Sequence, residues 1–354
     1  MTQSVYPPES SFSEGDRNLL SQYWHPVALS SDVGETRPFA TRLLDVNLVL
    51  YRLGGLTVAL DRCPHRGTRM SMGTIANGSL VCPYHGLEFN GRGICTRIPG
   101  ESRATRIPDR FRIPTFMSQE AYGLIWVCLS GNPRCPIPDW SCLEREGNQR
   151  FSLQAVWNTS APRQVENFND LAHFATVHAA TFGSAEHPEV PPYVVEQRPH
   201  GLYFDAIIPL VDATVQNVRA EYELAYPFAT RLTLHYTRGI EYICDVASPI
   251  ALGQTRVFLL LSRDHDQDRP LKEWRNFQET VNEEDRPMVE SQIPLSLPLD
   301  TQMEWHLASD QFSAAFRQYW RDLGMSSSTQ AVRLPEARLP RSAASTFNPD
   351  GRHP

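Results

Sequence analysis

The sequence of 354 residues predicts an α+β protein in two parts, an all-β N-terminal part followed by a part with a sheet and helices. Between residues 39 and 129, short apolar runs alternate with turn dipeptides. From residue 203 to 262, longer strand-like runs follow one another with turn signals between them, which is typical of an antiparallel sheet. Two helical stretches then follow, at 271–284 and 310–323.

In the first part, hairpin signals separate the predicted strands. Gly54-Gly55 lies between two apolar runs and Asn90-Gly91 between two others, and both dipeptides are typical of tight turns. Three prolines between residues 133 and 138 indicate a boundary after this part. The expected strands are 43–52, 56–60, 80–82, 87–89, 94–98 and 122–129.

The second part begins with a stretch of helical character at 163–181, which has few β-branched residues before its end. The helix predicted at 271–284 can extend to 292, and the one at 310–323 carries an apolar stripe with a 3.6-residue period. The expected strands between them are 203–210, 220–226, 230–236, 241–247 and 255–262.

These patterns suggest four segments along the chain. Residues 1–22 form an N-terminal segment, residues 23–140 the first domain and residues 141–325 the second domain. Residues 326–354 are rich in Ser, Pro and Arg and lack hydrophobic periodicity, so we expect a flexible tail there.

The composition excludes several classes of protein. The net charge is 33 − 40 = −7 with dispersed basic residues, which argues against a nucleic-acid-coating protein. Seven cysteines are too few, and odd in number, for a disulfide scaffold, and they suit a reducing compartment. No apolar run reaches the roughly 20 residues of a membrane span, and no secretory signal is visible, so we expect a cytoplasmic protein.

Two short segments, Cys63-Pro-His65-Arg-Gly and Cys82-Pro-Tyr-His85-Gly, each combine one thiol with one imidazole. Zinc could take all four ligands, but zinc sites usually place the two cysteines in one knuckle and the histidines in another. In a Rieske [2Fe–2S] centre, two Cys hold one iron and two His hold the other, so each loop gives one ligand to each iron. The mixed loops therefore favour a Rieske cluster, and the five other cysteines are interpreted as structural.

The two segments resemble the signature of the Rieske non-haem iron oxygenases, and the similarity extends from about residue 23 to residue 324. One departure is Leu87, where many members have Trp. The vanillate O-demethylase branch shares that Leu, so the chain is more similar to this branch. The resemblance implies an oxygenase (alpha) component with a Rieske domain and a helix-grip catalytic domain, in which an antiparallel sheet curls round a long helix.

A second cluster of polar residues lies at Asn167, Asp170, His173 and His178. On a helix, residues three apart share a face, so the first three would lie together. His178 lies five residues after His173, about 140° round an ideal helix. Both can bind one metal only if the helix is widened or broken between them.

This segment is similar to the Asp-x-x-His-x-x-x-x-His motif of the same family. The resemblance implies that His173 and His178 are ligands of a mononuclear Fe(II). It implies that Asp170 is a bridging acid that links His85 of one chain to His173 of the next, and Asn167 is counted with it as a candidate catalytic residue.

The third iron ligand should be a carboxylate far downstream. The residues leave five candidates open, which are Asp285, Glu290, Asp300, Glu304 and Asp310. Asp310 could instead cap the final helix. Similarity to the methylxanthine N-demethylase oxygenases favours Asp310, with Glu304 in reserve, and Asp285 and Glu290 are interpreted as solvated helix charges or an ion-pair network.

The chain has no Gly-x-Gly-x-x-Gly motif for a dinucleotide and no plant-type ferredoxin spacing. Electrons must therefore come from a separate NAD(P)H-dependent reductase, with or without a ferredoxin, and O₂ is the co-substrate. The family implies a homotrimer in which the Rieske domain of one chain meets the catalytic domain of another.

The similarity favours hydroxylation or oxidative demethylation of an N- or O-methyl group on a small aromatic or heterocyclic substrate. The alternatives are cis-dihydroxylation of an aromatic ring, a Rieske electron-transfer protein without oxygenase activity, and a zinc-bound structural module. A polar N-heterocycle and a methoxylated aromatic acid are equally open. Arg163, Arg219 or Arg231 could pair with a substrate carboxylate, although each is more typical of a surface charge.

Overall fold

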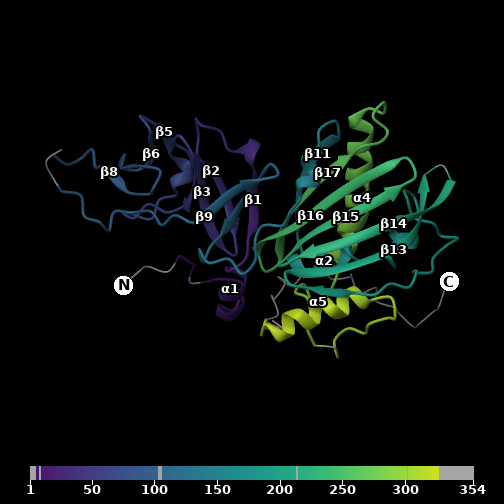
Figure 1. Cartoon of the computed structure of the whole chain (residues 1–354). Helices are drawn as coiled ribbons and strands as arrows, with labels where there is room; N and C mark the ends of the chain where they lie inside the picture. Colours follow the sequence, from purple (N-terminus) through teal and green to yellow (C-terminus); the bar gives the residue numbers. More distant parts are fainter. Residues whose placement is uncertain (1–4, 8, 103–105, 213, 301, 327–354) are drawn as a thin grey trace, which may run out of the picture.

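The computed structural model describes residues 5–7, 9–102, 106–212, 214–300 and 302–326. The predicted tail, apart from Ser326, lies outside the described residues. In Figure 1 the N-terminal strands, in purple and blue, lie beside a large green sheet that carries the helices. The α+β class and the order of its two parts are therefore confirmed.

The N-terminal part contains three small antiparallel sheets after helix α1 (Glu14–Leu20). One sheet has the order β1-β10-β9, the second β2-β3-β4 and the third β5-β6-β7-β8. Their strands are β1 (His25–Leu29), β2 (Phe39–Leu43), β3 (Val46–Arg52), β4 (Leu56–Leu60), β5 (Thr74–Ala76), β6 (Ser79–Val81), β7 (Glu88–Phe89), β8 (Cys95–Arg97), β9 (Met117–Ala121) and β10 (Leu124–Cys128).

The expected strand at 43–52 is interrupted by a tight turn. Leu44 and Asp45 have φ values of 48° and 67°, so the chain reverses there and gives two strands, β2 and β3. The backbone N–H groups of these two residues donate to the carbonyls of Pro249 and Ile250, at 2.8 and 2.9 Å. The turn therefore joins the N-terminal part to the large sheet.

The large sheet is antiparallel and has the strand order β11-β17-β16-β15-β14-β13-β12. All five predicted strands are present, and two further strands were not predicted. Of these, β11 pairs with β17 along nine residues, and its alternating Phe151, Leu153, Ala155 and Trp157 form a strand pattern that was not recognised. The strands are β11 (Gln149–Trp157), β12 (Glu196–Arg198), β13 (Gly201–Asp212), β14 (Thr214–Ala225), β15 (Ala229–Tyr236), β16 (Gly239–Ala251) and β17 (Gln254–Arg263).

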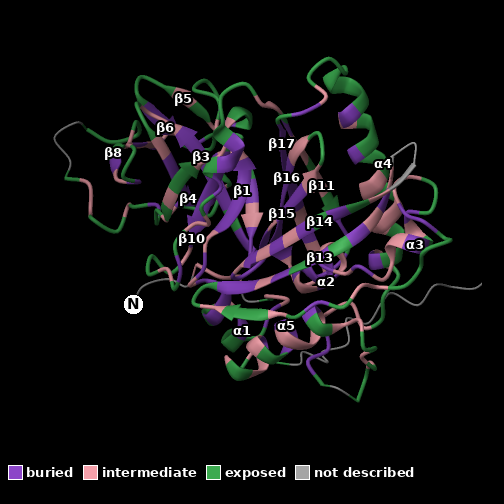
Figure 2. Cartoon of the chain, turned by 45° about the vertical axis from the view of Figure 1, so that its right-hand side comes forward, coloured by how far each residue is buried: buried purple, intermediate pink, exposed green. Residues whose placement is uncertain are grey.

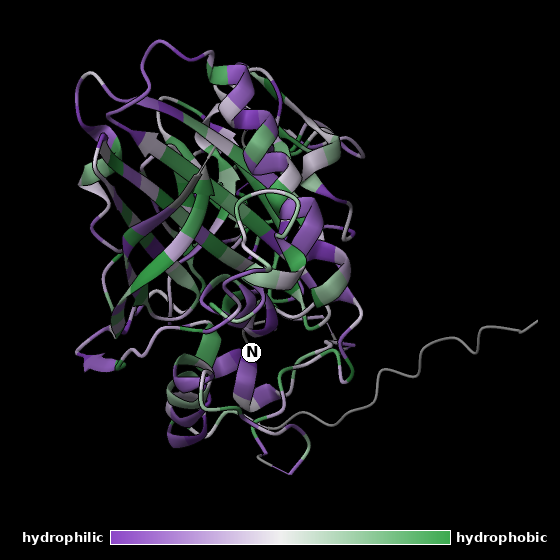
Figure 3. Cartoon of the chain, turned by 90° about the vertical axis from the view of Figure 1, so that its right-hand side faces the viewer, coloured by the Kyte–Doolittle hydropathy of each residue, from purple (hydrophilic) through white to green (hydrophobic). Residues whose placement is uncertain are grey.

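Four helices accompany this sheet: α2 (Ala161–Phe168), α3 (Phe174–Val177), α4 (Leu271–Glu290) and α5 (Gln311–Asp322). The long α4 crosses one face of the sheet, as Figure 1 shows. Strand β16 is buried along ten successive residues because it contacts α2 and also β1 and β2. Figure 2 shows the buried centre of the sheet, and Figure 3 shows apolar residues concentrated on its strands.

The predicted helix at 163–181 is broken. Helix α2 ends at Phe168, and Asn169 follows it with its side-chain Nδ2 donating to the Val165 carbonyl at 2.8 Å and to Thr230 Oγ1 at 3.0 Å. Five residues later the single turn α3 begins. No helix among the described residues is both long and apolar enough to cross a membrane.

His25 in β1 makes the stability of this fold dependent on pH. Burial lowers the pKa of His25 to about 4, against the smaller opposing effect of its 2.9 Å contact with the Leu20 carbonyl. Between that value and the ordinary 6.5 only the unfolded chain binds the proton, so this contribution to stability is lost as the pH falls.

We therefore expect His25→Gln, whose amide can still donate to the Leu20 carbonyl, to lose less stability than the wild type on acidification. The difference should reach about 2 kcal/mol between about pH 7.5 and about pH 5, measured by urea unfolding. An equal loss in both proteins would contradict this origin of the pH dependence.

Candidate active site

Two equivalent loops carry the Cys-His pairs, one after β4 and one between β6 and β7. In each loop the glycine four residues after the cysteine closes a turn. Gly67 N–H donates to the Cys63 carbonyl at 2.9 Å, and Gly86 N–H donates to the Cys82 carbonyl at 3.1 Å. Both glycines have positive φ, at 75° and 69°, a conformation that other residues rarely adopt.

The two loops bring their ligands together in like pairs. Cys63 and Cys82 are buried and their thiols interact, while the rings of His65 and His85 are exposed with centroids 4.6 Å apart. Burial raises the pKa of the Cys63 thiol to about 11, and the adjacent Cys82 adds to this effect. Two sulfurs on the inner side and two imidazoles on the outer side fit the donor set of a Rieske cluster.

A second site lies where the broken helix meets α4. His173 and His178 stand at the two ends of α3, and their Nε2 atoms are 3.2 Å apart. Asp285 of α4 places Oδ1 at 3.3 Å from Nε2 of His173 and at 3.2 Å from Nε2 of His178. Three such donor atoms, all within 4.8 Å of one another, could hold a single metal ion. Two imidazoles and one carboxylate are the donors of a non-haem Fe(II) site.

The two histidines flank one unbroken helical turn, with His173 at the N-cap and His178 at the C-cap of α3. The expectation of a widened or broken helix between them is therefore wrong, because the break lies before His173. The expectation that Asn167, Asp170 and His173 share one helical face is wrong, because α2 ends at Phe168.

A carboxylate holds the outer nitrogen of each histidine. Asp170 Oδ2 lies 2.9 Å from Nδ1 of His173, and Glu284 Oε2 lies 2.8 Å from Nδ1 of His178. Thr181 Oγ1 donates to the same Glu284 oxygen at 2.8 Å. A carboxylate on Nδ1 fixes the orientation of the ring and leaves Nε2 for a metal.

The surroundings of Asp285 hold its carboxylate in place and keep it ionised. Asn167 Nδ2 donates to Asp285 Oδ1 at 3.2 Å. Burial alone would raise the pKa of Asp285, but the hydrogen bonds and charges of His173 and His178 outweigh burial and lower the pKa to about 2. This carboxylate is thus ionised, as a metal ligand must be.

The structure does not bring Asp310, the predicted third ligand, into this group. Asp310 precedes α5, where Oδ2 accepts from the Leu307 N–H at 2.8 Å. Asp285 takes its place and is not the solvated charge that its sequence context suggested, since its side chain is only 15% exposed. The reserve candidate Glu304 is held by Arg163 and Arg317, at 2.6 and 2.8 Å.

The other polar candidates are engaged elsewhere. Glu290 pairs with Arg286 at 2.9 Å, as the ion-pair interpretation expected, and Asp300 accepts from the Gln302 N–H. Arg219 and Arg231 form ion pairs with acids on neighbouring strands, which agrees with their interpretation as surface charges. Glu284 was missed because it resembles the other acids of α4, and only its contact with His178 distinguishes it.

A cavity of about 310 Å³ opens beside the two histidines and Asp285, between the large sheet and α4. Its walls near the metal-ligating residues are mostly apolar and aromatic. They include Phe168, Phe174, Phe182, Ile208, Leu210, Leu232, Leu234 and Leu259. A cavity of this size suits a ligand of one or two rings.

Comparison with known proteins agrees with this geometry. Residues 23–116 match the Rieske [2Fe-2S] domain, and residues 157–325 match the vanillate O-demethylase oxygenase C-terminal domain. The chain is 30% identical to methylxanthine N1-demethylase NdmA of Pseudomonas putida over 89% of its length and 92% of the relative. It is also 30% identical to methylxanthine N3-demethylase NdmB of that organism, over 88% and 91%.

The structure of NdmA with caffeine, from Pseudomonas putida, superposes with a TM-score of 0.81 and 28% identity, covering 87% of this chain and 92% of that one. The chain belongs to the Rieske non-haem iron oxygenases and is an oxidoreductase. Its cofactors are therefore a Rieske [2Fe-2S] cluster and a mononuclear iron, with O₂ as co-substrate.

Two matched variants test the assignment of the third ligand. Asp285→Asn should lose the mononuclear iron and keep the Rieske EPR signal, because the cluster loops lie in the other part of the chain. Asp310→Asn should keep both. Iron content and EPR of the purified proteins measure this, and loss of iron from Asp310→Asn alone would restore Asp310 as the ligand.

The outer carboxylate Glu284 offers a second test. Glu284→Gln should weaken iron binding roughly 10- to 100-fold, because His178 loses its charged partner. The neighbouring Glu283→Gln is the control, since Glu283 is 65% exposed and lies 3.6 Å from Arg286. Iron affinity by chelator competition gives the comparison, and equal affinities would argue against the role of Glu284.

Proposed function

We propose that the chain is a terminal oxygenase that oxidatively demethylates an N- or O-methyl group of a small aromatic or heterocyclic molecule. The main support is the mostly apolar cavity beside His173, His178 and Asp285, in a chain that also carries the two Cys-His loops. Two similar proteins are named as methylxanthine N-demethylases, and the matched C-terminal domain is named for a vanillate O-demethylase.

We assign Cys63, His65, Cys82 and His85 to the cluster and His173, His178 and Asp285 to the mononuclear iron. When bound, the cluster brings electrons from a separate NAD(P)H-dependent reductase or a ferredoxin, and the iron activates O₂. The exposed rings of His65 and His85 present the edge of the first site to a partner.

The residues around the second site keep it ready for a substrate. Asp170 and Glu284 orient the two imidazoles, and Asn167 holds Asp285. The apolar walls exclude water and hold the substrate's methyl group near the open side of the site. One methyl C–H becomes C–OH, with O₂, two electrons and two protons consumed and water released, and the hydroxymethyl group then leaves as formaldehyde.

Asp170 has a second proposed role in a homotrimer. Its side chain is 28% exposed while it holds His173, so one edge remains open to His85 of a neighbouring chain. We divide the chain accordingly into a Rieske domain at 23–140 and a catalytic domain at 141–325. The five cysteines outside the cluster loops are free thiols, which supports a cytoplasmic location.

The test of this function is turnover of paired substrates with NADH and a surrogate reductase. Theobromine, which carries N-methyl groups and a ring N–H, represents N-methyl substrates, and vanillate represents O-methyl substrates. We expect formaldehyde in proportion to O₂ consumed from at least one of the two classes. A cis-diol product would favour ring dihydroxylation, and a colourless protein with one zinc per chain would refute the cluster.

Asp170→Asn tests the bridging role. The carboxylate accepts from the backbone N–H groups of Ala172, at Oδ1 (3.0 Å), and of His173, at Oδ2 (3.1 Å), and the single amide oxygen can keep one of these bonds. We expect iron binding to weaken, as in Glu284→Gln, because His173 loses its charged partner, while turnover per bound iron in protein saturated with Fe(II) falls at least about 10-fold. Unchanged turnover would contradict the role, and iron content is the control.

A further inference from the structure

The cavity has a polar end whose chemistry selects the substrate, an inference that rests on the proposed function. Trp274, Gln278 and Asp285 all line the cavity from α4, at spacings that place them on one helical face. Gln278 and Asp285 are seven residues apart, or about 10 Å along the helix axis. A ligand of one or two rings can therefore reach from the polar end to the metal-ligating residues.

Glu241 of β16 lies at this polar end and is buried. Its Oε1 accepts from Trp274 Nε1 at 3.1 Å and from Gln278 Nε2 at 3.4 Å. Its Oε2 lies 3.9 Å from Nε2 of His265, which is too long for a hydrogen bond. One carboxyl oxygen is thus held by protein donors, and the other faces the cavity end with room for a ligand donor.

His265 lies beside Glu241 but offers no donor to the cavity. Its Nε2 is fully buried and has no hydrogen-bond partner in the described part of the chain, so a ligand atom cannot reach it. Its Nδ1 lies 3.2 Å from Arg238 Nε and 3.1 Å from Asp266 Oδ2. The Oε2 atom of Glu241 is therefore the group at this end that a ligand can use.

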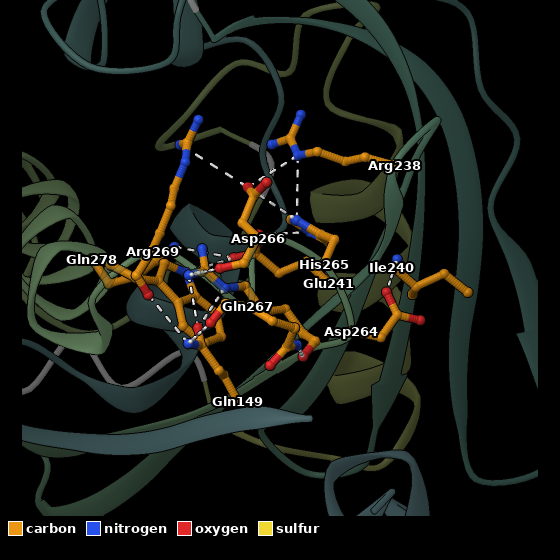
Figure 4. A network of polar contacts seen from close by, with 12 residues as sticks. Gln149, Arg238, Ile240, Glu241, Asp264, His265, Asp266, Gln267, Arg269 and Gln278 are labelled. Carbon is orange, nitrogen blue, oxygen red and sulfur yellow. Dashed lines mark hydrogen bonds and ion pairs between the residues drawn. The ribbon is translucent and has the colours of Figure 1, made fainter. Parts of the chain in front are cut away.

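The nearby cations already have partners. Figure 4 shows Asp266 between Arg238 and Arg269, with Asp266 Oδ2 at 3.1 Å from the first and 4.0 Å from the second. Arg263 donates to Gln149 Oε1 at 2.8 and 3.1 Å and lies over the Trp274 ring. A ligand carboxylate would therefore meet the Glu241 carboxyl group without an unmatched cation to balance it.

Burial raises the pKa of Glu241 to about 7, while the Trp274 hydrogen bond and the charges of Arg263 and Arg238 oppose this rise. The carboxylate form is therefore incompletely stabilised by the protein. A ligand N–H directed at Oε2 would supply the missing hydrogen bond.

We propose that Glu241 is a specificity-determining residue that anchors a neutral substrate through a ring N–H, such as that of a lactam or cyclic ureide. Glu241 Oε2 accepts from the substrate N–H. The methyl group to be oxidised then lies at the opposite end of the substrate, toward His173, His178 and Asp285. Aromatic acids are disfavoured.

Calorimetric binding to the full-length, metal-loaded protein tests this without turnover. The probes are 1-methylquinazoline-2,4-dione, its 1,3-dimethyl analogue, in which a methyl replaces the N–H, and 6-methoxy-2-naphthoate. We expect the N–H probe to bind at least about 10-fold more tightly than either of the others. Equal affinities, tighter binding of the naphthoate, or no binding of the N–H probe would overturn the proposal.

Matched variants assign the preference to Glu241. In Glu241→Gln the Trp274 N–H retains the amide oxygen, so the amide NH₂ faces the ligand and the preference should fall to about one. Glu273→Gln, an exposed acid at the rim of the cavity, should keep the preference. A preference that survives Glu241→Gln would overturn the assignment.

Thermal unfolding and the visible absorption of the cluster show whether each variant is folded. If a variant does not fold, the comparison of the three probes on the wild-type protein still tests the proposal. Formaldehyde release is measured in parallel. Formaldehyde from the dione probes without discrimination by the N–H group would refute the anchor and leave demethylation standing. Tighter binding of the N–H probe without formaldehyde from any probe would support the anchor and argue against demethylation.

Discussion

The contact of Asp285 with both His173 and His178 is the interaction on which the rest of the catalytic part depends. His173 and His178 cap the two ends of the single helical turn α3, and their Nε2 atoms lie 3.2 Å apart. The carboxylate comes from α4, more than one hundred residues later. It reaches the histidines only because α2 and α4 lie together against the large sheet.

Neighbouring side chains hold the three residues of this contact in place. Each imidazole has a carboxylate on Nδ1, and the Asn167 amide holds the Asp285 oxygen that faces both Nε2 atoms. The cavity uses the same face of α4, so one helix positions the metal-ligating acid and also Trp274 and Gln278 at the polar end. Chemistry and substrate selection are therefore coupled through the placement of a single helix on the sheet.

Local patterns predicted much of this arrangement. Turn dipeptides and apolar runs indicated the hairpins and the five central strands, because these signals act over a few residues. Strand β11 was missed although apolar residues stand at alternate positions along it, and it lies at the edge of the sheet paired with β17. The Cys-His loops and the two histidines were found because their spacing within one segment reflects the geometry of metal binding.

The sequence by itself determined the class of protein and the donors that lie close together in the chain, namely Cys63, His65, Cys82, His85, His173 and His178. The tertiary structure decided between Asp285 and Asp310, and it identified Glu284 and Glu241. These acids look alike in the sequence, whether on α4, on β16 or at the start of α5. Which of them becomes a ligand depends on helix phase and on the packing of α4 against α2, and spacing along the chain does not encode contacts between distant segments.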